Sequence, residues 1–117
     1  MKLGRKASGG KYIKRRKKKS REESGQKRIV KLDKDKRKNI RGRGGKKKTV
    51  LLSGKFINLG KKKVEIKNVL ETPSNRFLAR QNILTKGTIV DTELGHAKIT
   101  NRPTQEGVIN GILIKKE

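Results

Sequence analysis

Residues 49–117 consist of short hydrophobic runs separated by turn-forming residues, a pattern typical of β-strands. Within one such run, Val64 and Ile66 fall on one side of the chain, while Glu65 and Lys67 fall on the other. Because successive side chains of a strand point to opposite faces of its sheet, this alternation predicts a half-buried strand.

Two pairs of these runs are joined by turn signals and predict hairpins. TVLLSGKFIN (49–58) and KKVEIKNVLET (62–72) flank Leu59-Gly60-Lys61, so we expect the chain to reverse there. GTIVDTELGHAKIT (87–100) predicts a second hairpin that turns near residues 93–95.

The remaining runs complete an all-β fold. TPSN (72–75) predicts a turn made rigid by its proline, and RFLARQN (76–82) fits either a short helix or a strand. NRPTQEG (101–107) predicts a loop, and VINGILI (108–114) is apolar on both faces, as a central strand would be. The result is a chain of about five or six mostly antiparallel strands, which we expect to close into a small barrel that protects its edges.

Charge and hydrophobicity are divided unevenly along the 117 residues, whose formal net charge is +25. Residues 1–48 hold 23 of the 35 Lys and Arg but only 9 hydrophobic residues, whereas residues 49–117 hold 25 hydrophobic residues. The first part cannot bury enough apolar surface to offset the entropy lost on ordering. We therefore expect a basic N-terminal extension over 1–48, joined to a small β-barrel domain over 49–117.

The excess of positive charge implies a polyanionic partner. An anionic membrane would require a broad apolar face, yet residues 12–24 contain only Tyr12 and Ile13 as large apolar side chains. Nucleic acid fits better, because each neutralised phosphate releases counterions. The absence of cysteine excludes disulfides and thiolate metal sites but leaves the redox compartment undetermined. There is no apolar run long enough to span a bilayer and no secretory signal, so we expect a soluble cytosolic protein.

The segment GRKASGGKYIKRRKKK (4–19) places nine cations in sixteen positions without an acidic residue. Gly9 and Gly10 predict a flexible joint. Tyr12 is expected either to stack on a base or sugar or to pack against the extension itself. The composition of Tyr12–Glu23 allows a short helix that orders only against phosphates, with a disordered solubilising tail as the alternative. The predicted RNA contacts are Arg5, Lys6, Gly9, Gly10, Lys11, Tyr12, Lys14, Arg15, Arg16, Lys17, Lys18 and Lys19.

A second basic segment, RGRGGKKK (41–48), combines glycines with guanidinium groups. Glycine allows close backbone approach and positive φ, and arginine forks suit phosphates and base edges. The spacing does not match the GxxxxGK[ST] nucleotide-binding loop. A clamp on an RNA backbone is favoured over a plain surface turn, and its predicted contacts are Arg41, Arg43, Gly44, Gly45, Lys46, Lys47 and Lys48.

The chain offers no constellation for catalysis or for a cofactor. The only histidine, His96, has no second histidine or cysteine with which to hold a metal. Asp91 and Glu93 are two residues apart and are expected to balance neighbouring charge. We therefore expect no enzyme activity, no metal and no cofactor.

Aromatic residues are scarce, and two of the three are expected in the core. This favours recognition of structured RNA through phosphates and shape over stacking on unpaired bases. A helix-turn-helix or similar scaffold for reading DNA sequence is not visible. The three aromatic residues are Tyr12, Phe56 and Phe77.

Three ordered segments resemble the e-type small-subunit ribosomal protein eight family of archaea and eukaryotes. GRKASGGKYIKRRKKK is similar to the family's Gly-Arg-Lys-Pro-Thr-Gly-Gly segment and basic run, with Ala7 and Ser8 in place of Pro-Thr. IRGRGGKKK (40–48) resembles its Arg-Val-Arg-Gly-Gly segment, with Gly42 in place of valine, and residues 82–114 resemble the C-terminal half of its archaeal members. The large insertion of eukaryotic members is absent, which indicates an archaeal-type chain.

The resemblance implies a structural protein of the small subunit of the cytoplasmic ribosome, with a β-barrel whose basic extension threads into ribosomal RNA. The implied partners are small-subunit ribosomal RNA and neighbouring ribosomal proteins, with one copy per subunit rather than a homo-oligomer, and without membrane or small-molecule substrate. Gly9 and Gly10 would let the backbone pass where a side chain would collide. The alternatives are a ribosome assembly factor of the same fold, a nucleoid-type DNA-compacting protein and an enzyme acting on RNA.

Overall fold

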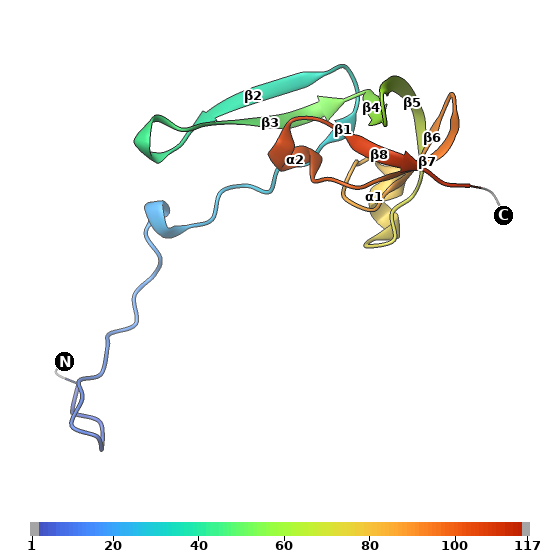
Figure 1. Ribbon diagram of the computed structural model, residues 1–117. Coiled ribbons are helices and arrows are strands. Elements are labelled where there is room, and N and C mark those ends of the chain that lie inside the picture. Colours follow the sequence, from blue (N-terminus) through green and yellow to red (C-terminus); the bar gives the residue numbers. More distant parts are fainter. Residues whose placement is uncertain (1–2, 116–117) are drawn as a thin grey trace.

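A closed five-stranded barrel forms the body of the protein, and a three-stranded sheet and a long N-terminal arm extend from it (Figure 1). The computed structural model describes residues 3–115. Its elements in chain order are η1 (Ser20–Glu22), β1 (Lys31–Leu32), β2 (Lys36–Arg41), η2 (Arg43–Gly45), β3 (Lys47–Gly54), β4 (Phe56–Leu59), β5 (Lys62–Glu71), α1 (Arg76–Arg80), β6 (Ile89–Thr92), β7 (Gly95–Ile99), α2 (Pro103–Glu106) and β8 (Asn110–Leu113).

The barrel runs in the order β4-β5-β6-β7-β8 and closes through a parallel pairing of β8 with β4. Asn58 lies opposite Asn110 in this pair, and its side-chain amide donates a 3.1 Å hydrogen bond to Asn110 Oδ1. A Cβ atom on the next residue, Gly111, would lie 2.6 Å from Ile57 Cδ1 and 2.7 Å from the Lys98 carbonyl oxygen. Closure of the barrel therefore depends on a glycine at this position.

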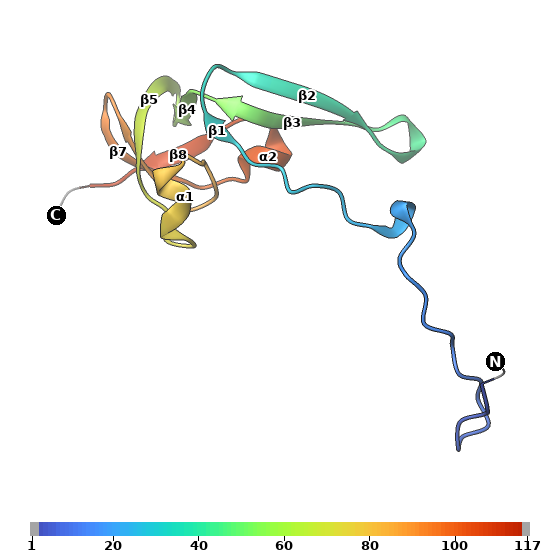
Figure 2. The ribbon, with the colours of Figure 1, turned by 180° about the vertical axis from the view of Figure 1, so that it is seen from behind.

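The second sheet has β3 in its centre, antiparallel to β2 and parallel to β1. The β2–β3 hairpin points away from the barrel and ends in the η2 turn, as seen from either side (Figures 1 and 2). Its outer part, residues 41–49, is exposed, and burial begins only at Val50 and Leu51 near its base. The hairpin is therefore held by backbone pairing over most of its length rather than by a core.

The hydrophobic core takes residues from both sheets. Ile57 and Ile99 come from the barrel, while Leu51 comes from β3 and Val30 from the segment just before β1. Backbone hydrogen bonds fix that segment, because the Val30 carbonyl oxygen accepts a 2.8 Å hydrogen bond from the Leu84 amide. The predicted division of the chain between residues 48 and 49 lies inside β3, and its assignment of two separate units stays a prediction.

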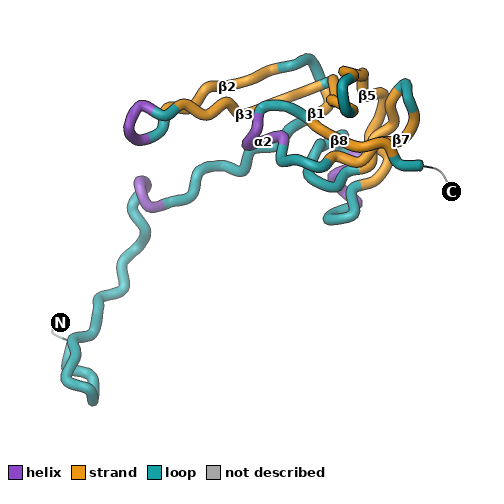
Figure 3. Tube along the Cα trace, viewed as in Figure 1, coloured by secondary structure: helices purple, strands orange, loops and turns teal. Residues whose placement is uncertain are grey.

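The N-terminal arm, residues 3–29, is almost entirely irregular in structure (Figure 3). The helix that composition allows over residues 12–23 is reduced to the single 3-10 turn η1, and residues 12–19 have no regular structure. With the arm extended, the described molecule measures 68 × 37 × 23 Å. The arm can therefore contact a partner well outside the surface of the barrel.

The expectation of an all-β fold with a small, mostly antiparallel barrel is confirmed. Both predicted hairpins are present, with β4 joined to β5 through Gly60 and β6 joined to β7 through residues 93–94. Val64 and Ile66 are buried on one face of β5, as their alternation indicates. RFLARQN contains the helix α1, which Asn75 caps by accepting a hydrogen bond from the Phe77 amide.

The prediction of one strand over residues 49–58 is wrong, because the chain changes sheets at Lys55. β3 pairs with β1 and β2, whereas β4 pairs with β5 and β8. At the corner, a Cβ atom on Gly54 would lie 3.0 Å from Ile109 Cδ1 and 3.0 Å from Leu51 Cδ2. The contact with Ile109 comes from a segment far along the chain, so residues 49–58 alone do not reveal the corner.

Of two further expectations near the C-terminus, one is wrong and one is confirmed. The predicted loop over residues 101–107 contains the helix α2, which starts with Pro103 and ends at Gly107 with φ of 74°. VINGILI does form a central strand, because β8 pairs with β7 on one side and with β4 on the other. Its residues Ile112 and Leu113 are nevertheless exposed, and they lie past the end of β4.

Candidate nucleic-acid interface

The arm presents its cations to solvent without shielding. Every residue from 3 to 29 is exposed, so the backbone and side chains of this segment are accessible along its whole length. Within the described residues, Arg16 is the one cation of this segment in an ion pair. Repulsion among the others is uncompensated inside the protein, which favours a partner that supplies closely spaced negative charge.

A tight turn shapes the first part of the arm. Arg5 and Lys11 form an isolated antiparallel bridge, and the Lys6 amide donates a 2.8 Å hydrogen bond to the Gly10 carbonyl oxygen. Gly9 has φ of 83°, a conformation that favours glycine, so it defines the turn rather than serving only as a flexible joint. The Lys6 ammonium group lies 5.9 Å from the centroid of the Tyr12 ring, so the predicted contacts in residues 5–12 surround one turn, whereas those in residues 14–19 lie beyond it.

Arg16 is paired within the arm. Its guanidinium group donates two hydrogen bonds, of 2.8 and 2.7 Å, to the carboxylate of Glu22. The same carboxylate accepts a 3.1 Å hydrogen bond from the Lys19 amide. The Arg16 contact, and secondarily the Lys19 amide, lower the pKa of Glu22, and the pKa of Arg16 is raised by the same carboxylate. The pair uses two of the five N–H donors of the guanidinium group and offsets its charge, so Glu22 competes with a phosphate for Arg16.

The tip of the β2–β3 hairpin forms the second basic surface. The Gly42 amide donates a 2.6 Å hydrogen bond to the Lys46 carbonyl oxygen, and Gly44 and Gly45 have φ of 69° and 76°. Arg41 lies directly opposite Lys47 across the strands. Like charges in such a pair destabilise a hairpin, so an anion bound at the tip would relieve the repulsion. The predicted contacts Arg41, Arg43, Lys46, Lys47 and Lys48 are all exposed on this tip.

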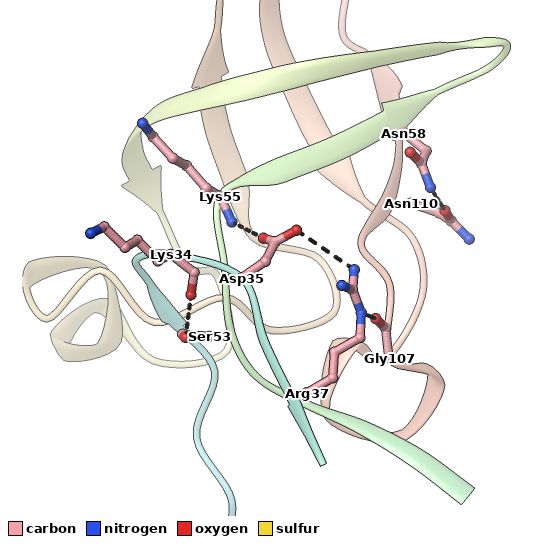
Figure 4. A network of polar contacts seen from close by, with 8 residues as sticks. All are labelled: Lys34, Asp35, Arg37, Ser53, Lys55, Asn58, Gly107 and Asn110. Carbon is pink, nitrogen blue, oxygen red and sulfur yellow. Dashed lines mark hydrogen bonds and ion pairs between the residues drawn. The ribbon is translucent and has the colours of Figure 1, made fainter. Parts of the chain in front are cut away.

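A polar network at the base of the hairpin joins it to the barrel (Figure 4). Arg37 Nε donates a 2.7 Å hydrogen bond to the Gly107 carbonyl oxygen, and its Nη2 lies 3.7 Å from Asp35 Oδ2. Asp35 Oδ1 in turn accepts a 3.0 Å hydrogen bond from the Lys55 amide. Sequence reasoning assigned Arg37 no role, because nothing in a basic run distinguishes a cation used internally from its neighbours.

All three aromatic side chains lie at the surface. Phe77 is 61% exposed, Tyr12 52% and Phe56 38%, so the expectation that two of them belong to the core is wrong. The physical reason is that aliphatic residues from both sheets fill the interior. Each ring instead has a cation near its face: Lys6 at Tyr12, Lys63 at Phe56 and Arg80 at Phe77.

Comparison with known proteins places these features in a family. The sequence matches the family model described as "Ribosomal protein S8e" over residues 1–114. The chain belongs to the ribosomal protein S8e family. It is 42% identical to "Small ribosomal subunit protein eS8" of Methanococcus aeolicus, with 96% of this chain and 93% of the relative covered. It is 46% identical to the protein of that name from Staphylothermus marinus, with the same coverage, and 38% identical to that from Methanosarcina barkeri, with 95% and 94% covered.

The resemblance found in the sequence is thereby confirmed, and the relatives have nearly the same length as this chain. Within the S8e chain, residues 3–115 contain no group of three or more His, Cys, Asp or Glu residues that could hold a metal ion. His96 lies at the start of β7, half-buried, with Nδ1 3.5 Å from Asp91 Oδ1. In the same part of the chain, no helix has the length and hydrophobicity needed to cross a membrane.

Proposed function

We propose that this protein is a structural component of the small ribosomal subunit that binds and stabilises folded ribosomal RNA. The observation that carries the proposal is the pairing of two exposed cationic surfaces, the arm and the hairpin tip, on a protein whose relatives are named small ribosomal subunit protein. Each phosphate bound by these surfaces releases counterions, so the free energy gained grows with the number of contacts.

The two surfaces have different roles. The arm is extended and without a core of its own, so it can enter narrow spaces between RNA helices and becomes ordered there. The hairpin tip is attached to the barrel through the Arg37 network and presents Arg41 and Arg43 from a defined position. Residues 1–48 thus carry the main phosphate contacts, and neighbouring ribosomal proteins are the further partners.

A structural role in the ribosome also implies where the protein acts and in how many copies. The protein acts in the cytoplasmic ribosome, in one copy per subunit, without enzymatic activity and without a cofactor. Gly10 lets the backbone pass close to RNA; inside the protein, a Cβ atom there would meet only Ser8 Oγ, at 3.9 Å. We expect a side chain at Gly10 to collide with the RNA rather than with the protein itself.

Fractionation of a native lysate on a sucrose gradient, after a high-salt wash, tests the proposal. We expect one copy in each mature small subunit, retained through the wash. Presence only in precursor particles would instead identify an assembly factor, and migration with DNA would identify a nucleoid-type protein. Duplex DNA bound as tightly as structured RNA would also contradict a ribosomal role.

A further inference from the structure

The helix α1 carries the most exposed of the three aromatic rings, and the helix is firmly attached to the barrel. Asn75 caps α1, the Ile83 amide donates a 3.1 Å hydrogen bond to the Leu78 carbonyl oxygen, and Ala79 packs against the core. Phe77 nevertheless keeps 61% of its surface in solvent. The ring is therefore an accessible plane on a helix whose backbone is held in place.

Beside this ring, α1 and β5 enclose an open groove of about 560 Å³. Arg80 links the two features, because its guanidinium carbon lies 5.8 Å from the centroid of the Phe77 ring and its side chain also lines the groove. Figures 1 and 2 show α1 on the side of the barrel away from the β2–β3 hairpin, so this groove is separate from the hairpin tip. The groove is lined by Asn68, Val69, Leu70, Arg76, Ala79, Arg80 and Asn82.

The groove is positively charged and carries amide groups. Arg76 and Arg80 contribute two guanidinium groups, neither of which forms an ion pair among residues 3–115, and no acidic residue lines the groove. Asn68 and Asn82 add side-chain amides, each of which can both donate and accept hydrogen bonds.

Two irregularities of the backbone shape the wall of the groove. The register of β5 against β6 shifts between Ile66 and Asn68 and again between Val69 and Glu71, and such bulges re-aim side chains. Asn82 has φ of 53°, the one positive value among the described non-glycine residues. Its backbone is held there by hydrogen bonds from the Asn82 amide to Ala79 and from the Leu32 amide to the Asn82 carbonyl oxygen.

Each of these features complements one part of an unpaired nucleotide. Its phosphate matches the guanidinium forks, its base edge matches the amides, and its aromatic face matches the ring. An acidic peptide would match the arginines but would leave the ring without a planar partner. We propose that the α1–β5 groove binds one unpaired RNA nucleotide, with its phosphate on Arg76 and Arg80 and its base stacked on Phe77. This site rests on the proposed RNA-binding function and adds stacking to the phosphate contacts of the arm and hairpin.

A fluorescence titration tests the site. The full chain is added to a single-stranded RNA octamer that contains a central 2-aminopurine. Stacking quenches 2-aminopurine, and titrations at several salt concentrations separate the stacking contribution from the salt-dependent contribution of the arm. We expect Phe77→Leu to weaken octamer binding about 5- to 150-fold at high salt and to abolish quenching. Phe77→Tyr keeps the planar ring, and we expect its affinity for the octamer to stay within about twofold of wild type.

Controls distinguish the site from a general effect on structure or charge. Phe56→Leu removes another exposed ring with a nearby cation and should leave quenching unchanged. An RNA duplex of equal length should bind to all variants with the same affinity. Arg80→Gln should make the slope of log K against log salt shallower by about 0.7 for the octamer. Octamer binding within twofold of wild type for Phe77→Leu, or displacement of the octamer by an acidic peptide at lower concentration than by RNA, would overturn the site. Absence of any RNA binding by the wild type would instead overturn the proposed function itself.

Discussion

Arg37 donates a hydrogen bond to the carbonyl oxygen of Gly107, a residue 70 positions further along the chain. This contact connects the base of the β2–β3 hairpin to the end of α2. One of the many cations in the basic region is thus used to orient the others. Together with the buried Val50 and Leu51 of β3, this contact holds the base of the hairpin, whose outer part has no core.

We predict that Arg37→Met weakens RNA binding without changing its salt dependence. The variant loses a hydrogen bond from a charged group, with a cost of about 1.5 to 3 kcal/mol in the free energy of unfolding. It also loosens the hairpin, while the number of bound phosphates stays the same. Lys38→Met, one position along the same strand, is the matched control: it should retain stability and, if Lys38 binds a phosphate, make the slope shallower. A shallower slope for Arg37→Met would show that Arg37 binds RNA directly.

The positive charge of the arm predicts that RNA affinity depends steeply on salt concentration. If the arm binds about ten phosphates, the slope of log K against log salt should lie near −7 to −9. Replacing Lys17–Lys19 by glutamine should make that slope shallower by about 2 to 3. The same change at Lys61–Lys63, an exposed triplet outside the proposed surface, should leave it unaltered. A wild-type slope shallower than about −3, or equal effects of the two triplets, would contradict the arm as the main contact.

Glu22 restrains Arg16, so Glu22→Gln should increase RNA affinity. Glu23→Gln removes the same charge from the next residue and controls for the general loss of repulsion. We expect Glu22→Gln to gain roughly twofold more than Glu23→Gln, because it also frees the guanidinium group. Equal gains would mean that the Arg16–Glu22 pair does not compete with phosphate.

The same pair predicts a pH dependence of the η1 turn. The pKa of Glu22 is lowered from its ordinary value of 4.5, so the turn is stabilised above pH 4.5 and loses that stabilisation as the pH falls through the lower, folded value. An NMR titration of the Glu22 carboxyl carbon should show this depression. In Arg16→Gln the pKa should return toward 4.5; an unchanged value would assign the shift to the Lys19 amide instead.

Gly10→Ala should separate contact with RNA from stability of the protein. Because a Cβ atom there meets only Ser8 Oγ at 3.9 Å, the free energy of unfolding should not change. If the backbone passes close to RNA, the extra methyl group should weaken binding at least about fivefold. Gly25→Ala, where a Cβ atom has no described atom within 4 Å, is the control within the same arm. Equal affinity of both variants would disprove close passage at Gly10.

Much of the fold was predictable because the signals are local. Alternation of Val64 and Ile66 with polar neighbours depends only on the period of a strand, and the turn at Gly60 depends only on a few adjacent residues. The cationic, apolar-poor character of residues 3–29 also follows from composition, whereas strands already begin at Lys31, inside the segment expected to be an extension. The family resemblance also rests on short segments, and the comparisons confirm it.

The corner at Lys55, the exposed aromatic rings and the internal use of Arg37 were not predictable in this way. Each depends on what lies opposite in space: Ile109 beside Gly54, a core already filled by aliphatic residues, and the Gly107 carbonyl oxygen beside Arg37. The groove beside Phe77 likewise requires α1 to pack on β5. The sequence alone determined the local conformations and the sign of the partner's charge, because neighbouring residues control both. Only the tertiary structure decided which side chains remain free to bind, because that depends on contacts between residues far apart in the chain.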